Sequence, residues 1–164
     1  MDFSEGLIGD LERHIFFVGQ LIVQLQSLEF VLRGAIIELA QQGEPQPELD
    51  SATEGDWVAK TPLTSFGGLR SVVDRFNEVA PAEDALDSAP LVALRDMLVH
   101  GRIFTTSPTR PFRVVKLGRE ADGKVTVETV VLMTDEWFLR QLEFVERAFF
   151  AAAKHCPSVR AEDV

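Results

Sequence analysis

Cysteine and histidine are nearly absent from this 164-residue sequence, which contains Cys156 alone and three histidines. A single thiol excludes an internal disulfide and a cysteine-based zinc site, and the histidines are too scattered for metal-ligand spacing. No apolar run approaches the roughly 18 residues of a membrane span, and the N-terminus is acidic where a signal peptide is basic. We therefore expect a cytoplasmic protein without metal, cofactor or membrane contact. We expect the Cys156 thiol to be solvent-side or loosely packed.

Basic residues are also scarce, with 16 Lys and Arg against 26 Asp and Glu and a net charge of −10. This balance argues against a protein that coats nucleic acid through a broad basic face. The positive charge is concentrated in one part of the chain. Residues 95–124 carry seven basic and three acidic side chains, whereas residues 1–60 carry three basic and eleven acidic ones. Two interpretations stay open: a cleft that attracts a phosphodiester, or a solvated β-hairpin with ordinary surface charge.

Hydrophobic residues make up 46% of the chain, enough for one domain with a real core. Apolar residues recur at alternating three- and four-residue spacing from Leu7 to Leu39, which predicts an unusually long helix with a coiled-coil-like seam ending at Gly43. Other apolar residues lie off the seam. We therefore expect this helix to be central in its core or shared with a second subunit. His14 within it is expected to be packed or on the surface.

An acidic, proline-containing connection follows over residues 44–60. We expect Trp57 to pin it to the core, and a stacking platform for a base is the alternative. Thr61 and Pro62 predict the start of a second helix. Its predicted buried stripe consists of Leu63, Phe66, Leu69, Val73, Phe76 and Val79.

Residues 112–117 and 124–133 are dense in β-branched side chains and predict two strands joined by a turn at Asp122 and Gly123. A hairpin over 112–133 is marginal alone, so it must pack on helices or pair with another copy. Thr134 predicts the N-cap of a last helix. We expect a mainly α fold, an up-and-down bundle of about four main helices with the hairpin inserted before the last. Residues 1–155 would form one domain and 156–164 a frayed tail.

The segment 91–104, LVALRDMLVHGRIF, places a compact group of ionisable residues inside an apolar helical run that begins at Ser88. Gly101 predicts the helix stop. Asp96 and His100 are separated by about 40° around a helix, so the carboxylate can reach and orient the imidazole. The predicted buried stripe is Leu91, Leu94 and Leu98.

The two arginines of this segment fall on one helix face, because Arg95 and Arg102 are separated by roughly 20°. Arg95 and His100 are separated by about 140° on an ideal helix. They converge within one chain only if Arg95 reaches round or the helix loosens at Gly101. A second copy of the helix would supply the missing partner.

Residues 95–101, RDMLVHG, resemble the Arg-x4-6-His motif of the HEPN superfamily. Its members are small helical proteins, many of them metal-independent endoribonucleases of toxin, antiviral or RNA-processing systems. The resemblance implies that His100 transfers a proton at the ribose 2′-hydroxyl or the leaving oxygen, and that Arg95 steadies the scissile phosphate. Asp96 would be the polar residue that follows the arginine. Two motifs usually face each other across a homodimer.

The resemblance thus implies an endoribonuclease of a toxin–antitoxin or defence system, cleaving RNA by 2′-hydroxyl transesterification. Arg95, Asp96 and His100 would be catalytic, with Arg102 binding substrate. The implied partners are a second copy of the chain, RNA, and an antidote or nucleotidyltransferase protein. The alternative is a noncatalytic HEPN-fold interaction module, in which Arg95, Asp96 and His100 form a buried, ion-paired corner that fixes a dimer.

Overall fold

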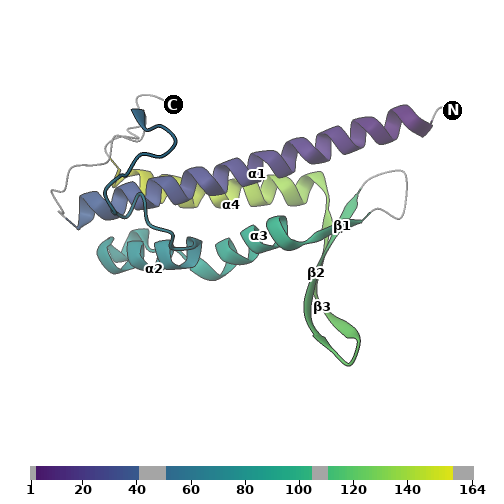
Figure 1. Ribbon diagram of the computed structural model, residues 1–164. Coiled ribbons are helices and arrows are strands. Elements are labelled where there is room, and N and C mark those ends of the chain that lie inside the picture. The colour runs from purple at the N-terminus through teal and green to yellow at the C-terminus, as the bar shows by residue number, and fades with distance from the viewer. Residues whose placement is uncertain (1–2, 41–50, 105–110, 157–164) are drawn as a thin grey trace. The chain divides into compact units, whose positions relative to one another are not determined.

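The computed structural model describes residues 3–40, 51–104 and 111–156 (Figure 1). Four α-helices and a three-stranded antiparallel sheet make the described chain mainly helical, as predicted. In chain order the elements are α1 (Phe3–Leu39), α2 (Leu69–Val79), the 3-10 turn η2 (Ala82–Asp84), α3 (Ser88–His100), β1 (Arg102–Phe104), β2 (Phe112–Ala121), β3 (Lys124–Met133) and α4 (Asp135–Ala153).

The sheet is larger than the predicted hairpin, because the chain forms a short strand, β1, directly after the motif helix. β1 lies beside β2 with Ile103 opposite Val114, and the strand order is β1-β2-β3. β2 continues four residues past the predicted Leu117, through register shifts that absorb the mismatch with β3. The turn is as predicted: Asp122 and Gly123 have φ of 53° and 69°, the two positive angles that a tight hairpin turn requires.

The chain divides into two compact units, each built from two separate stretches of sequence. Unit 1 comprises Met1–Leu25 and Pro90–Glu146, and unit 2 comprises Gln26–Ala89 and Arg147–Val164. The helices α1, α3 and α4 each contribute residues to both units. The single domain expected over residues 1–155 stays a prediction.

Aromatic rings form the centre of unit 1. The His14 ring is buried and lies 4.4 Å from the ring of Phe112 and 5.5 Å from that of Phe138, measured between centroids. Phe17 stacks on Phe138 at 5.0 Å. His14 is therefore a packed core residue, one of the two outcomes expected. The other buried apolar side chains of the unit are Leu21, Leu25, Leu91, Leu94, Met97, Val114, Met133 and Val145.

Unit 2 surrounds the second half of α1, where every residue from 31 to 37 is buried. A Cβ added to Gly34 would lie 2.7 Å from the Cys156 Sγ atom, so the helix backbone and the thiol are in close contact. Cys156 is only 2% exposed, and our expectation of a solvent-side or loosely packed thiol is wrong. The rest of the predicted tail, 157–164, lies outside the described residues.

The first half of α1 departs from the predicted seam. Leu11 and Ile15 are 44% and 60% exposed, and the buried position between them is His14. From Leu21 onward the predicted seam is buried, through Leu25, Leu28, Leu32 and Ala35. Over Gly9–Leu39 the helix is long and apolar enough to cross a membrane, a test that core helices of soluble proteins also meet. The predicted end at Gly43 lies outside the described residues.

The second helix begins later than predicted, because an arginine on α1 holds the preceding segment in a loop. The guanidinium of Arg33 donates to the carbonyl oxygens of Pro62 and Gly67, at 2.7 and 2.6 Å. These bonds hold residues 62–67 outside any helix, and α2 starts only at Leu69. Phe66, predicted to be buried, is fully exposed, as is Trp57, which therefore does not pin the acidic connection.

Candidate functional site

The motif helix α3 has the predicted bounds. The Asp87 carboxylate accepts a hydrogen bond from the backbone N–H of Ala89 at 3.0 Å, which satisfies one free donor at the helix start. The helix ends at His100, where the N–H of Gly101 donates to the Met97 carbonyl at 2.9 Å. Leu91, Leu94 and Met97 are the buried residues, whereas the predicted Leu98 is only half-buried.

Gly101 lies at the junction between α3 and β1. A Cβ at this position would collide with the carbonyl oxygen of Met97 and with the side chain of Val114 on β2. Glycine therefore lets the strand approach the helix end closely. The close approach fixes the direction in which the chain leaves His100.

The four predicted site residues lie on this part of unit 1. Arg95, His100 and Arg102 are exposed, and Asp96 is half-buried. Arg95 Nη1 lies 3.6 Å from Asp96 Oδ1. Among the described residues no hydrogen bond joins Asp96 to His100, so the predicted orienting contact is not formed. An exposed pair at this distance is weak, and it leaves the guanidinium available to a ligand.

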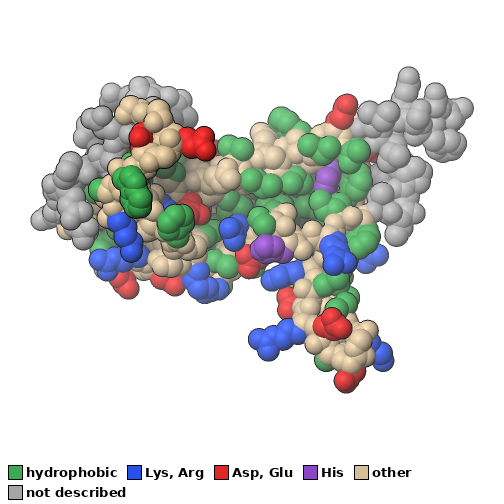
Figure 2. All heavy atoms as spheres, viewed as in Figure 1, with side chains coloured by type: hydrophobic (Ala, Val, Ile, Leu, Met, Phe, Trp, Pro, Cys, Tyr) green, Lys and Arg blue, Asp and Glu red, His purple; other side chains and the backbone are tan. Residues whose placement is uncertain are grey.

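The sheet adds an arginine that the sequence alone did not place. Arg102 of β1 lies opposite Val115, and Phe104 lies opposite Arg113. Arg102 and Arg113 are therefore diagonal neighbours on one face, close enough for long side chains to act on one anion. Figure 2 shows Lys and Arg side chains gathered at the base of the hairpin and along it. The sequence did not predict that Arg113 lies near Arg102 because β1 was not predicted. A three-residue strand after a helix is too short to show a periodicity of its own.

Of the three histidines, His155 takes part in a separate polar cluster in unit 2. Its Nε2 lies 2.8 Å from Asp84 Oδ2, and Lys154 Nζ donates to Asp84 Oδ1 at 2.6 Å. Hydrogen bonds from Lys154 and His155 lower the pKa of the buried Asp84 carboxyl below its usual range. The cluster ties the 3-10 turn to the end of α4, which is a structural role.

A metal site is not evident in the described segments, where no three His, Cys, Asp or Glu side chains converge. The site contains one exposed imidazole, that of His100. Arg95 and Arg102 are close to it in the sequence, and Arg113 lies on the strand that pairs with β1. That combination suits acid–base chemistry on an anionic substrate. No protein-family model, curated protein or solved structure matches this chain.

Proposed function

We propose that this protein is a HEPN-like, metal-independent endoribonuclease that works in the cytoplasm as a homodimer with an up-and-down helical fold. The observation that carries the proposal is the exposure of Arg95, His100 and Arg102. A motif with only a structural role would be buried beneath the sheet. An exposed imidazole with arginines nearby is accessible to a polymer.

The chemistry assigned to His100 is proton transfer. Imidazole accepts and returns protons near neutral pH better than any other side chain. The base form removes the proton from a ribose 2′-hydroxyl, whose oxygen attacks the adjacent phosphorus. The bond from phosphorus to the 5′-oxygen breaks, and that oxygen receives a proton from an imidazolium. The products are a 2′,3′-cyclic phosphate and a 5′-hydroxyl, and the reaction requires no metal or external oxidant.

The arginines would stabilise the charge that builds up on the phosphorus oxygens. A guanidinium can bind two phosphate oxygens at once, which favours Arg95, Arg102 and Arg113 over lysines in this role. The exposed pair with Asp96 at 3.6 Å is weak enough to leave the Arg95 guanidinium free to bind phosphate. These groups also explain how a protein with net charge −10 attracts RNA, since local potential rather than total charge steers the substrate.

The dimer is part of the proposal because Arg95 and His100 diverge by about 140° around α3. A second copy brings its own arginine toward the imidazole and supplies a second histidine as the acid. Unit 1 has apolar side chains available for such an interface: Leu11, Ile15, Phe16 and Val23 of α1 are each at least 44% exposed. A toxin or defence role with an antidote or nucleotidyltransferase partner follows from the resemblance alone.

The test is incubation of purified protein with structured and single-stranded RNA in EDTA. We expect cleavage that His100→Ala lowers by about 10²–10⁴-fold, the usual contribution of acid–base catalysis. Arg95→Ala should lower it by roughly 10²–10³-fold. Lys124→Ala, which removes an exposed cation at the hairpin turn, is the matched control and should leave the rate unchanged. Equal cleavage by wild type and His100→Ala would overturn the assignment.

The second candidate is a noncatalytic dimeric interaction module. The exposed apolar side chains of α1 favour it, because a large apolar surface is a common mark of a protein interface. This function predicts a dimer that binds RNA weakly and cleaves none of the panel. The same RNA cleavage assay therefore distinguishes the two candidate functions.

A further inference from the structure

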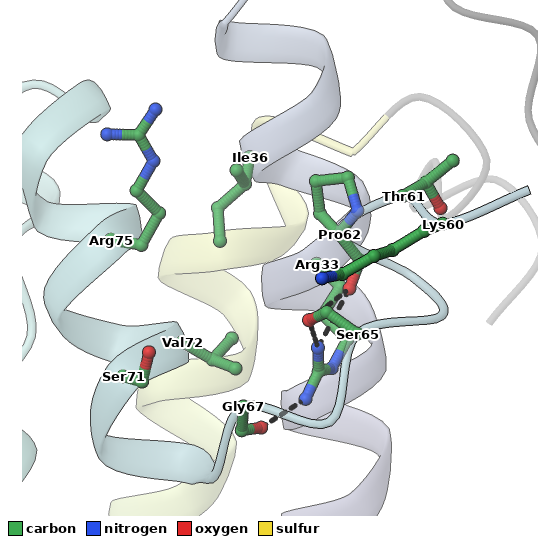
Figure 3. Close-up of a pocket in the computed structure, with 10 residues that line it drawn as sticks. All are labelled: Arg33, Ile36, Lys60, Thr61, Pro62, Ser65, Gly67, Ser71, Val72 and Arg75. Carbon is green, nitrogen blue, oxygen red and sulfur yellow. Dashed lines mark hydrogen bonds between the residues drawn. The ribbon is translucent and has the colours of Figure 1, made fainter.

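In unit 2, the loop that Arg33 fixes and the start of α2 border an open cavity of about 340 Å³. Figure 3 shows Ser71, Val72 and Arg75 of α2 on one side of it and Lys60, Pro62 and Ser65 on the other. This volume falls at the lower end of the range for small-molecule sites, about 300–1,000 Å³. The cavity can hold a metabolite of modest size.

The lining is cationic in a protein that is strongly acidic overall. Arg33, Lys60 and Arg75 line the cavity, and none of its ten lining residues is Asp or Glu. Lys60 extends its side chain toward the space between the loop and α2 (Figure 3). Ser71 adds to the polar lining, whereas the Ser65 hydroxyl already donates to the Pro62 carbonyl at 3.2 Å and the Thr61 Oγ1 atom is buried. Cations and hydroxyls without carboxylates are the donors that a phosphate group requires.

Each cation has a distinct role. Arg33 is committed to the fold, because its Nη atoms bind Glu29, Ser65 and two backbone carbonyls. Arg75 pairs with Glu78 through Nη1 at 2.5 Å, which leaves other N–H groups of its guanidinium for a ligand. Lys60 is exposed and its charge faces the cavity. Lys60 and Arg75 are therefore the groups that would bind an anion.

The N-terminus of α2 reinforces this polarity. Gly67, Ser71 and Val72 at that end line the cavity, and the helix has no side-chain cap and no acidic residue in its first turn. The first backbone N–H groups of a helix lack internal partners and carry partial positive charge. Their partial charge adds to the positive potential of the lining.

The remaining lining is apolar. Ile36, Pro62 and Val72 contribute the apolar surface. Phe66 lies between the lining residues Ser65 and Gly67, and its ring is fully exposed. The ring is not part of the lining, so a base bound in the cavity would pack against the apolar surface. Inorganic phosphate alone would leave these apolar groups unused.

We propose that this cavity binds a nucleoside monophosphate, with the phosphate held by Lys60 and Arg75 and the base packed against Ile36, Pro62 and Val72. The proposal is independent of the ribonuclease assignment, because all of its residues belong to unit 2 and the motif belongs to unit 1. No chemistry on the nucleotide is implied.

The test is equilibrium dialysis of the full chain with AMP, GMP, CMP and UMP, each against its nucleoside, and with inorganic phosphate. We expect at least one monophosphate to bind and its nucleoside to bind at least tenfold more weakly. Lys60→Gln and Arg75→Gln should each weaken binding by about tenfold, the loss of one charge-assisted contact. Arg70→Gln is the matched control, since Arg70 is on the same helix and does not line the cavity.

Two further variants make the proposal falsifiable in detail. Ser71→Asp places a carboxylate in the cavity and should abolish monophosphate binding while the unfolding midpoint stays close to wild type. Phe66→Ala, which changes a residue outside the lining, should leave nucleotide binding unchanged. The proposal is overturned if no monophosphate binds at millimolar concentration, if Ser71→Asp binds as wild type does, or if only a 5′-phosphorylated RNA oligonucleotide binds.

Discussion

Gly101 and Val114 are in such close contact that no side chain fits between the end of the motif helix and the second strand. The two residues belong to different elements, and their contact fixes the point at which the chain leaves His100. The glycine that follows the histidine is therefore explained by packing and not by helix termination alone.

Gly101→Ala should destabilise the protein by about 1–3 kcal/mol, the usual cost of forcing a methyl group into a packed site. Chemical unfolding measures the change. Gly9→Ala is the control, because nothing lies within 4 Å of a Cβ there and alanine favours a helix. A Gly101→Ala protein as stable as wild type would show that the contact is looser than described. On the proposed function, RNA cleavage should fall as well, because the imidazole is displaced.

A second glycine pair separates packing from helix propensity within α1. Gly34→Ala should cost about 1–3 kcal/mol, because the new methyl group meets the Cys156 Sγ atom. Gly19→Ala, in open space on the same helix, should instead stabilise by roughly 0.5–1 kcal/mol. Adding Cys156→Ala to Gly34→Ala should recover part of the loss, since the clashing sulfur is removed. Similar effects from both glycine substitutions would contradict the contact.

The Asp84 cluster predicts an acid-dependent loss of stability. Hydrogen bonds from Lys154 and His155 lower the pKa of Asp84 in the folded state. The stabilisation is therefore fully present above the unfolded carboxyl pKa of about 3.9, and it is lost as the pH falls through the lower folded value. Asp84→Asn should be less stable than wild type at pH 7. The difference should shrink below about pH 4. Urea unfolding midpoints of both proteins, measured across this pH range, test the prediction. A stability difference between wild type and Asp84→Asn that stays constant with pH would refute it.

The exposed face of α1 predicts how the proposed dimer can be broken. Ile15 is 60% exposed, so Ile15→Glu should leave folding stability within about 0.5 kcal/mol of wild type. The same change buries a charge in an apolar interface and should give a monomer by light scattering. RNA cleavage should be lost with the dimer. Gln20→Glu, at another exposed position on the helix, is the charge-matched control. If the wild-type protein is itself a monomer by light scattering, the proposed site shared between two copies is wrong.

Features with strong local signals were predictable from the sequence. The bounds of α3, the Thr134 cap and the Asp122–Gly123 turn each depend on nearby residues alone. The Thr134 hydroxyl indeed accepts a hydrogen bond from the Trp137 N–H at 3.1 Å. Local chemistry of this kind is visible without knowledge of the fold.

Features that depend on distant contacts were not predictable. Arg33 lies 29 residues before Pro62, yet its hydrogen bonds convert an apparent helix start into a loop. β1 exists only because β2 is beside it, and the pairing of Asp96 with Arg95 depends on side-chain orientation. The cavity in unit 2 is lined by loop residues that Arg33 holds in place, so it was not predictable from local sequence patterns.

The most direct test of the central claim uses an oligodeoxynucleotide that contains one ribonucleotide, incubated with the protein in EDTA. The substrate contains a single 2′-hydroxyl, so transesterification can occur at one bond only. We expect cleavage at that bond, a 2′,3′-cyclic phosphate end, and loss of both with His100→Ala. An intact chimera in the presence of a protein that cleaves all-RNA substrates, or cleavage that His100→Ala retains, would contradict it.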